Sequence, residues 1–201
     1  LDDGYTTSED TRLTVAAIGV LSNDQDFEGD PLSVIALNGN SAGMGLQVSL
    51  ASNALLRLNS DGSFEYDPNR QFDHLAAGGL LTDTFTYQLS DGSDVSTATV
   101  VISVTGVNDA PIAVADQAVT DEGTPLLDLD LLGNDTDPDD AVLSIVSLDS
   151  SAAIGRVTLT DGRVDYDPRG RFDDLVAGAT AADSFSYTVS DPLGATATAT
   201  V

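Results

Sequence analysis

The sequence of 201 residues contains no Cys, no Lys and no Trp, and all seven of its strongly basic residues are Arg. Without Cys the chain has no disulfide, no thiolate nucleophile and no zinc site built on sulfur. Its 33 acidic residues give a formal net charge of −26, which disfavours nucleic acid and anionic membrane surfaces as partners. No apolar run reaches about 18 residues, so we predict no membrane insertion.

Asp is the residue that the chain has in excess, because it outnumbers Glu by 29 to 4. Apolar residues nevertheless make up 41% of the sequence, which is sufficient for packed cores and argues against disorder as the reason for the charge. The chain opens on Leu1 without a signal-like segment, so we expect it to be a piece of a longer protein.

An internal repeat organises the sequence. Residues 61–68 (DGSFEYDP) return as residues 161–168 (DGRVDYDP), a shift of 100, whereas residues 23–26 match residues 134–137 at a shift of 111. The first copy therefore carries about eleven extra residues between Val34 and residue 61, which we expect in a loop or an added hairpin.

Two copies of this length predict two domains, residues 1–109 and residues 110–201, joined at residues 106–111 (GVNDAP). Residues 1–110 hold 16 acids and 3 Arg, and the remaining residues hold 17 acids and 4 Arg, so each half carries a charge of −13. The acidity thus belongs to the repeat and not to a tail. The second copy matches the first only as far as Val100, so we expect its last strand to be truncated.

Alternation with a period of two predicts the secondary structure. Phe85, Tyr87 and Leu89 share one face of a strand, and polar residues occupy the other face. In the first copy we predict strands at residues 13–20, 32–37, 46–50, 55–58, 63–66, 82–89 and 98–104, and at most a turn or two of helix within residues 72–81. The Asp-Gly pairs at 61–62 and 161–162 predict hairpin turns.

About seven short strands per copy indicate an all-β chain of two tandem immunoglobulin-like antiparallel β-sandwich domains. We interpret Tyr87 and Tyr187 as plain half-buried strand residues rather than tyrosine corners.

Two acidic loops carry the candidate chemistry. They are residues 23–30 (NDQDFEGD) and residues 134–140 (NDTDPDD), each placed between two predicted strands. Acids at alternate positions of a short loop can converge on one point, which suits a hard cation that takes six to eight oxygens. Two carboxylates about 4 Å apart repel by roughly 1 kcal/mol in water and about 4 kcal/mol at an effective dielectric constant of 20. A solvated acidic turn is the alternative, but recurrence in both copies favours Ca²⁺. The spacing is not that of an EF-hand, because Ile35 stands where the closing Glu is required.

The order of the motifs resembles the VCBS or cadherin-like tandem repeats of large RTX-type bacterial adhesins. The motifs are E-D-T at 9–11, L-x-N-D-x-D at 21–26, D-G-x-F-x-Y-D-P at 61–68, D-x-F-x-Y-x-x-S-D at 83–91 and V-N-D-A-P at 107–111. The second copy departs from this pattern at Gly123, Ala141 and Pro192. The resemblance implies that the two sandwich domains are cadherin-like.

The resemblance also implies calcium at the joint of the two domains. The ligands that it implies there are Glu9, Asn108, Asp109, Asp135, Asp137 and Asp191. Either Asp73 or Asp83 would add a further ligand, and the sequence does not choose between them. Asp24, Asp26 and Asp91 would form weaker sites that face a preceding domain, and Glu122 takes the position of Glu9 in the second copy.

We therefore expect a calcium-rigidified structural extender of a bacterial surface adhesin, supporting cell adhesion or biofilm formation. Its partners would be neighbouring repeats of the same chain, its location extracellular after type I secretion, and the fragment itself a monomer. The alternative is a calcium-assisted glycan-binding module, but Phe27, the one aromatic residue in an acidic loop, is replaced by Pro138 in the second copy. We expect no enzymatic activity, because His74 becomes Asp174 in the second copy and no other His or Lys could activate a Ser.

Overall fold

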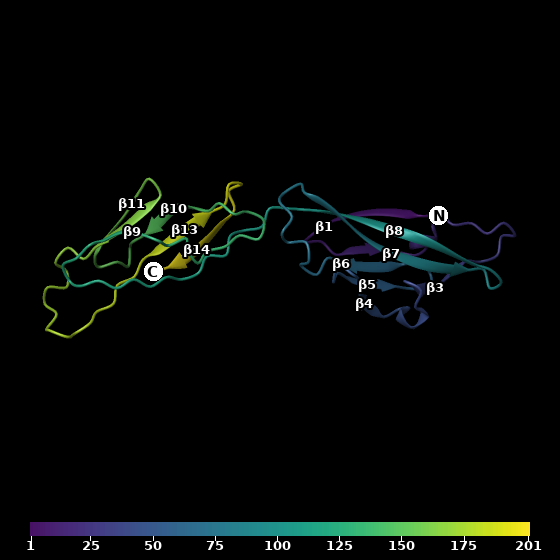
Figure 1. The fold of residues 1–201 in the computed structure, drawn as a ribbon, viewed down its shortest axis with the longest axis horizontal. Helices are drawn as coiled ribbons and strands as arrows, with labels where there is room; N and C mark the ends of the chain where they lie inside the picture. The colour runs from purple at the N-terminus through teal and green to yellow at the C-terminus, as the bar shows by residue number, and fades with distance from the viewer. The chain divides into compact units, whose positions relative to one another are not determined.

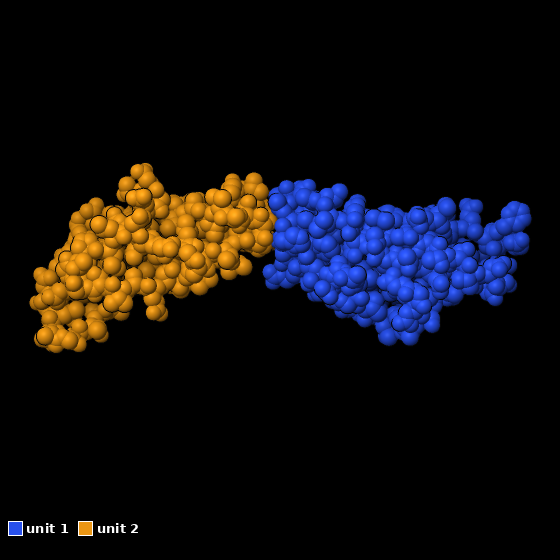
Figure 2. Space-filling model, viewed as in Figure 1, with its two compact units in different colours: residues 1–107 blue, residues 108–201 orange.

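The computed structural model describes all residues from 1 to 201 and consists of strands and two 3₁₀ helices of three residues each (Figure 1). The chain divides into two compact units, Leu1–Val107 (unit 1) and Asn108–Val201 (unit 2), coloured blue and orange in Figure 2. The prediction of an all-β chain is confirmed. Neither 3₁₀ helix has the length or the apolar character of a membrane span.

Unit 1 contains two four-stranded sheets. Its elements are β1 (Asp3–Ser8), β2 (Leu13–Val15), η1 (Gly19–Leu21), β3 (Ser33–Leu37), η2 (Ser41–Gly43), β4 (Gln47–Ser49), β5 (Leu55–Leu58), β6 (Phe64–Asp67), β7 (Leu80–Ser90) and β8 (Val95–Thr105). The strand orders are β1-β8-β7-β3 and β2-β6-β5-β4. Every pairing is antiparallel except that of β1 with β8, which is parallel.

The core of unit 1 is formed by the inward residues of both sheets. Phe64 of β6 packs edge-on between two rings, with centroid distances of 4.9 Å to Tyr5 and 5.7 Å to Phe85. The predicted inward face of β7 is confirmed, since Phe85, Tyr87 and Leu89 are all buried. Aromatic side chains of this size bury more apolar area than any other residues, so these contacts link the two sheets.

One segment of unit 1 differs from its prediction. The strand predicted at 13–20 ends at Val15, and η1 follows it, because Gly19 turns at a φ of +52° and Val20 N donates to Gly62 O at 3.0 Å. The interval from residue 72 to Gly79 forms single turns, within the predicted limit of a turn or two, and β7 begins at Leu80. Gly78 has a φ of +80° and donates its N–H to Gly106 O, which lies outside the interval. A helical ladder cannot continue through such a residue.

The extra residues of the first copy form an added hairpin at a sheet edge, as predicted. They supply η2 and β4, and β4 pairs with β5 from Gln47↔Arg57 to Ser49↔Leu55. The Asn40 side chain caps η2 by accepting the N–H of Ala42. The insertion thus lengthens one sheet and leaves the strands that flank the acidic loop unchanged.

Unit 2 contains two three-stranded sheets with the orders β10-β13-β14 and β11-β12-β9. Its strands are β9 (Leu126–Leu129), β10 (Ser144–Asp149), β11 (Arg156–Thr160), β12 (Arg163–Asp167), β13 (Ser186–Ser190) and β14 (Thr196–Thr200). The β11–β12 hairpin turns at the predicted Asp161 and Gly162, whose φ values of +50° and +79° suit a two-residue turn. The core gathers around Tyr187, whose side chain has no exposed area.

Candidate metal centre

The acidic loop of unit 2 is tied to the segment that opens this unit. Ile112 N donates to Thr136 O at 2.7 Å, and Thr136 N donates to Ile112 O at 3.1 Å. At the start of the loop, Asp135 N donates to Leu132 O at 3.2 Å. These bonds fix the first half of the loop, so that residues 137–140 project from it as a tight turn.

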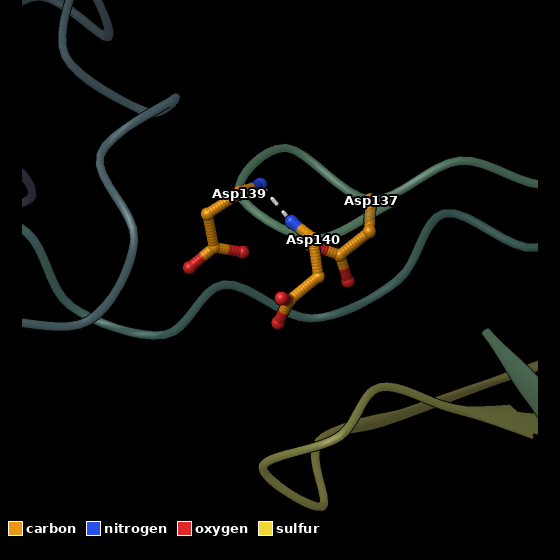
Figure 3. A group of neighbouring side chains, drawn as sticks. All are labelled: Asp137, Asp139 and Asp140. Atoms are coloured by element: carbon orange, nitrogen blue, oxygen red, sulfur yellow. Dashed lines mark hydrogen bonds between the residues drawn. The ribbon is translucent and has the colours of Figure 1, made fainter. Parts of the chain in front are cut away.

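Asp137 organises that turn. Its Oδ1 accepts the backbone N–H of Asp139 at 3.1 Å and that of Asp140 at 3.0 Å. Carboxylate oxygens of Asp137, Asp139 and Asp140 consequently lie within 4.8 Å of one another. Figure 3 shows the three carboxylates on the same side of the loop. They form the one group of three metal-ligating side chains that the structure brings together at this distance.

This acidic cluster is electrostatically costly. Two ionised carboxylates at that separation repel by roughly 1 kcal/mol in water and about 3 kcal/mol at an effective dielectric constant of 20. Burial and then the neighbouring Asp137 raise the pKa of Asp139 to about 6. In addition, Asp137 Oδ2 and Asp139 Oδ1 are buried and accept no hydrogen bond. The cluster therefore offers buried, unpaired oxygens that a cation would satisfy.

Predicted residues of the joint lie next to the acidic cluster within unit 2. Asp109 N donates to Asp139 Oδ2 at 3.4 Å, and Asn108 Nδ2 donates to Asp191 Oδ2 at 2.7 Å. The Asn108 Oδ1 atom is buried and accepts no hydrogen bond. Burial would raise the pKa of Asp191, but hydrogen bonds from Asn108, Gly194 N and Ala195 N outweigh it and hold this pKa below its usual value. Asp191 is therefore an ionised oxygen donor beside the Asn108 amide.

Asp135 is not part of the acidic cluster, and its carboxylate accepts hydrogen bonds from other parts of unit 2. Its carboxylate accepts the Val114 N–H at 2.7 Å and lies 3.1 Å from the Tyr187 hydroxyl, which also donates to Leu131 O at 2.8 Å. In unit 1 the Tyr87 hydroxyl likewise contacts Asp24 at 2.7 Å.

The interpretation of both Tyr side chains as plain half-buried strand residues was wrong, because both are fully buried and their hydroxyls reach backbone carbonyls. Alternation along a strand does not reveal this contact, which comes from a segment more than fifty residues away.

The remaining predicted ligands lie apart from the acidic cluster or in unit 1. Glu9 is 2% exposed, and its Oε1 accepts the Val107 N–H at 2.8 Å. Asp83 is buried and accepts hydrogen bonds from Tyr66 and Ser52, whereas the alternative Asp73 pairs with Arg70 at 2.8 Å. Asp26 and Asp91 cap turns through the N–H groups of Asp30 and of Ser93 and Asp94, and Glu122 is exposed. Their roles as metal ligands, like those of Asp24 and Asp135, stay predictions.

Sequence reasoning selected Asp137 but not Asp139 and Asp140. The selection relied on positions that recur in both copies, and Glu28 and Gly29 stand at the matching positions of the first copy. The signal that could have found the two residues is local: they follow Asp137 at the second and third positions, where an Asx turn folds the chain back onto its first carboxylate.

The comparisons with known proteins identify the family. The model of the bacterial cadherin-like domain matches residues 1–106, which is more than half of the chain. The chain belongs to this family. Its second part, residues 108–201, matches the bacterial Ig domain, so the prediction of two tandem cadherin-like and Ig-like sandwich domains is confirmed. The comparison with curated proteins found no match.

Solved structures similar to this cadherin-like chain include cadherins. The human protocadherin-24 EC1-2 structure is 14% identical with a TM-score of 0.47, over 98% of this chain and 88% of that one. The protocadherin GammaB4 extracellular domain is 14% identical with a TM-score of 0.39, over 99% of this chain and 33% of that one. The endo-fucoidan hydrolase MfFcnA4 is 20% identical with a TM-score of 0.35, over 99% of this chain and 27% of that one. This chain thus spans a third or less of the last two structures, and similarity at this level carries no argument about function.

Proposed function

We propose that this chain is a calcium-stabilised structural segment of a bacterial surface adhesin. The observation that carries the proposal is the acidic cluster of Asp137, Asp139 and Asp140, with its buried and unpaired oxygens, in a chain of the bacterial cadherin-like family. Cadherin-like and Ig-like bacterial domains suggest an extracellular role in adhesion or as structural repeats.

The residues present fit Ca²⁺. This ion takes six to eight oxygen ligands from carboxylates, amide carbonyls and water. The cluster would supply carboxylate oxygens, and Asn108, together with the nearby carboxylate of Asp191, would supply more. A bound cation would neutralise the repulsion within the cluster, and the residues that would hold it are those of the acidic loop together with Asn108 and Asp191.

The proposed role is mechanical. Residues 108–109 open unit 2, and tying them to its loops shortens the free connection between the two units. A series of such repeats would hold the tip of a large adhesin of RTX type away from the cell, after type I secretion, and would support cell adhesion or biofilm formation. Neighbouring repeats of the same chain are then the partners. On the family resemblance we retain Glu9, Asp109, Asp135 and Asp137 as proposed ligands.

Two other classes of function are less well supported. A calcium-assisted glycan-binding site needs an aromatic platform beside the metal, but Phe27, which is 98% exposed, lies in unit 1 and outside the acidic cluster. We also propose no catalytic role, because the modules of these families are typically structural.

Small-angle scattering with and without calcium tests the mechanical role. With calcium we expect a longer particle with less conformational spread, and with excess chelator a shorter and more flexible one. The physical reason is that calcium immobilises residues 108–109 against the acidic loop. The measurement is the pair-distance distribution of the chain. The ionic strength is matched between the two samples, because salt that screens the net charge of −26 also changes the dimensions of the particle.

Two variants complete the scattering experiment. Asp137→Asn in calcium should scatter as the chelated chain does, whereas Asp149→Asn, which makes the same charge change at another Asx turn of unit 2, should scatter as the wild type does. Identical curves with calcium and with chelator would refute the extender role even if calcium binds.

A further inference from the structure

The strand β11 lies at an open edge of a sheet in unit 2 (Figure 1). It pairs only with β12, whereas its counterpart in unit 1, β5, lies between β6 and β4. The strand β4 belongs to the extra residues of the first copy, which the second copy lacks. Leu56 and Leu58 of β5 have no exposed area, but their counterparts Val157 and Leu159 are only partly buried. The edge of β11 is thus open because an internal segment is absent from the second copy.

Unit 1 shows which backbone groups of β11 point to this edge. Leu58 O accepts the Gly45 N–H at 2.8 Å, so the backbone groups of Leu58 point away from β6. In an antiparallel ladder this direction alternates from one residue to the next. Val157 and Leu159 keep the register of β5 against β6, so their N–H and C=O groups point to the open edge. Those of Thr158, which lies between them, point to β12.

β11 also lacks the features that protect other edge strands of the chain. An edge strand resists pairing with a foreign strand when it is very short, bulged or charged. β2 and β4 have three residues each, β3 and β10 are bulged, and β9 carries Asp128 at a φ of +55°. β11 has five residues without a register shift, Pro or acid, and its one charged residue is Arg156. It therefore stays open to pairing and does not repel an acidic chain.

We propose that β11 pairs with β11 of a second copy of the chain, antiparallel and about a two-fold axis at Thr158. The occupant is a second copy because the open groups of β11 match themselves under this rotation. Val157 of one copy lies opposite Leu159 of the other, and each such pair exchanges two backbone hydrogen bonds. Arg156 lies opposite Thr160, so the only charge that each strand brings into the pairing is positive. Two sheets of three strands then form one sheet of six.

The pairing is weak between free chains. Five residues from each copy bury far less than the 1,200 Å² or so of a stable interface, and two chains of charge −26 repel one another at low salt. At micromolar concentration we therefore expect a monomer. Tethered neighbours reach effective concentrations of about 1 mM, at which the pairing would join adhesin chains side by side. This consequence rests on the proposed function, whereas the pairing itself needs no calcium.

Disulfide trapping tests the register, because the chain has no Cys of its own. Val157 and Leu159 pack against the core, so Thr158 lies on the outer face and can be replaced without disturbing it. Across the axis the two Thr158 Cα atoms would lie about 4.5 Å apart, within the range of a disulfide. We expect the full chain with Thr158→Cys, at about 1 mM in a glutathione redox buffer, to form mostly disulfide-linked dimer. Chelator is present, and about 0.5 M salt screens the net charge.

Thr160→Cys is the matched control on the same face of the same strand. In the proposed register it is displaced by four residues, about 13 Å, from Thr160 of the other copy. With rates scaled to the reaction of each thiol with a small reagent, it should dimerise at least tenfold more slowly. A mixture of Thr160→Cys with Arg156→Cys should regain fast linkage, as a heterodimer of distinct mass, because these positions are opposed.

Hydrogen exchange distinguishes strand pairing from proximity alone. In the dimer linked through Thr158→Cys, the amides of Val157 and Leu159 should exchange at least tenfold more slowly than in the reduced chain. The amide of residue 158, which already points to β12, should change less.

Three results would overturn the proposal. Equal trapping of Thr158→Cys and Thr160→Cys would mean random collision of exposed thiols. Unchanged exchange at Val157 and Leu159 in the linked dimer would mean proximity without pairing. Protection of both amides in the reduced monomer would assign the edge to a segment of the same chain. Because chelator is present throughout, each of these results leaves the calcium proposal untouched.

Discussion

Saturating calcium is expected to raise the melting temperature of unit 2 by roughly 10–20 °C. A ligand that binds only the folded state stabilises it by about 2.7 kcal/mol at 100 times its dissociation constant. In a domain of this size each kcal/mol shifts the melting temperature by about 4–8 °C. The stabilisation is expected in unit 2 because Asp137, Asp139 and Asp140 repel one another there and leave buried oxygens unpaired.

Differential scanning calorimetry of the full chain measures this shift. The transition of unit 2 is the one that Val164→Ala lowers, because Val164 is fully buried in the core of that unit. Asp137→Asn should abolish most of the calcium shift, since it keeps the Oδ1 acceptor of the turn and removes the charge. Asp149→Asn should keep the shift. Equal shifts in the two variants would mean that calcium only screens the net charge.

Gly62→Ala is expected to destabilise unit 1 by roughly 3–5 kcal/mol. Gly62 has a φ of +82°, and a Cβ atom added there would lie 2.1 Å from Ile18 O and 3.0 Å from Leu21 Cγ. Neither the backbone carbonyl nor the segment that follows it can move freely, because Gly62 O accepts the Val20 N–H at 3.0 Å. The substitution therefore adds a backbone clash to the ordinary cost of a positive φ.

Gly162→Ala provides a matched control for this substitution. Gly162 stands at the corresponding position of the second copy with a φ of +79°, but a Cβ atom added there meets nothing within 4 Å. We expect it to cost only about 1–2 kcal/mol, the penalty of a left-handed conformation. Chemical denaturation of both variants, followed by circular dichroism, measures the two free energies of unfolding. Equal losses would contradict the close packing of this turn against residues 18–21 in unit 1.

The sequence predicts those parts of the fold that depend on local pattern. Alternation placed Phe85, Tyr87 and Leu89 on an inward face, and the Asp-Gly pairs placed two hairpin turns, because a period of two and a positive φ are local requirements. The end of β2 at Val15 depends instead on contact between Gly19 and Gly62, which are distant in the chain. The alternation of apolar and polar residues along a strand cannot predict a contact between two residues so far apart in the sequence.

The candidate site likewise has a part that local sequence predicts and a part that depends on tertiary contacts. The acidic loops could be found from their composition, and Asp137 from its recurrence in both copies. The participation of Asp139 and Asp140 depends on how one Asx turn folds, and the engagement of Asp135 by Tyr187 depends on tertiary packing. A carboxylate chosen by repeat position can therefore keep one oxygen without a hydrogen-bond partner, as Asp137 does at Oδ2, or have both oxygens engaged, as Asp135 does.

Isothermal titration of the full chain with calcium tests the central claim most directly. At pH 7.5 we predict saturable binding with a dissociation constant of roughly 10⁻⁴ M or tighter, weakened at least tenfold by Asp137→Asn. Since the pKa of Asp139 is raised to about 6, this carboxyl is mostly protonated at a pH of about 5.5, and calcium must displace the proton. Affinity should therefore fall roughly fourfold there and be regained as the pH rises through that pKa. The absence of saturable binding up to about 10 mM calcium, or equal binding by Asp137→Asn, would contradict a metal centre in this loop.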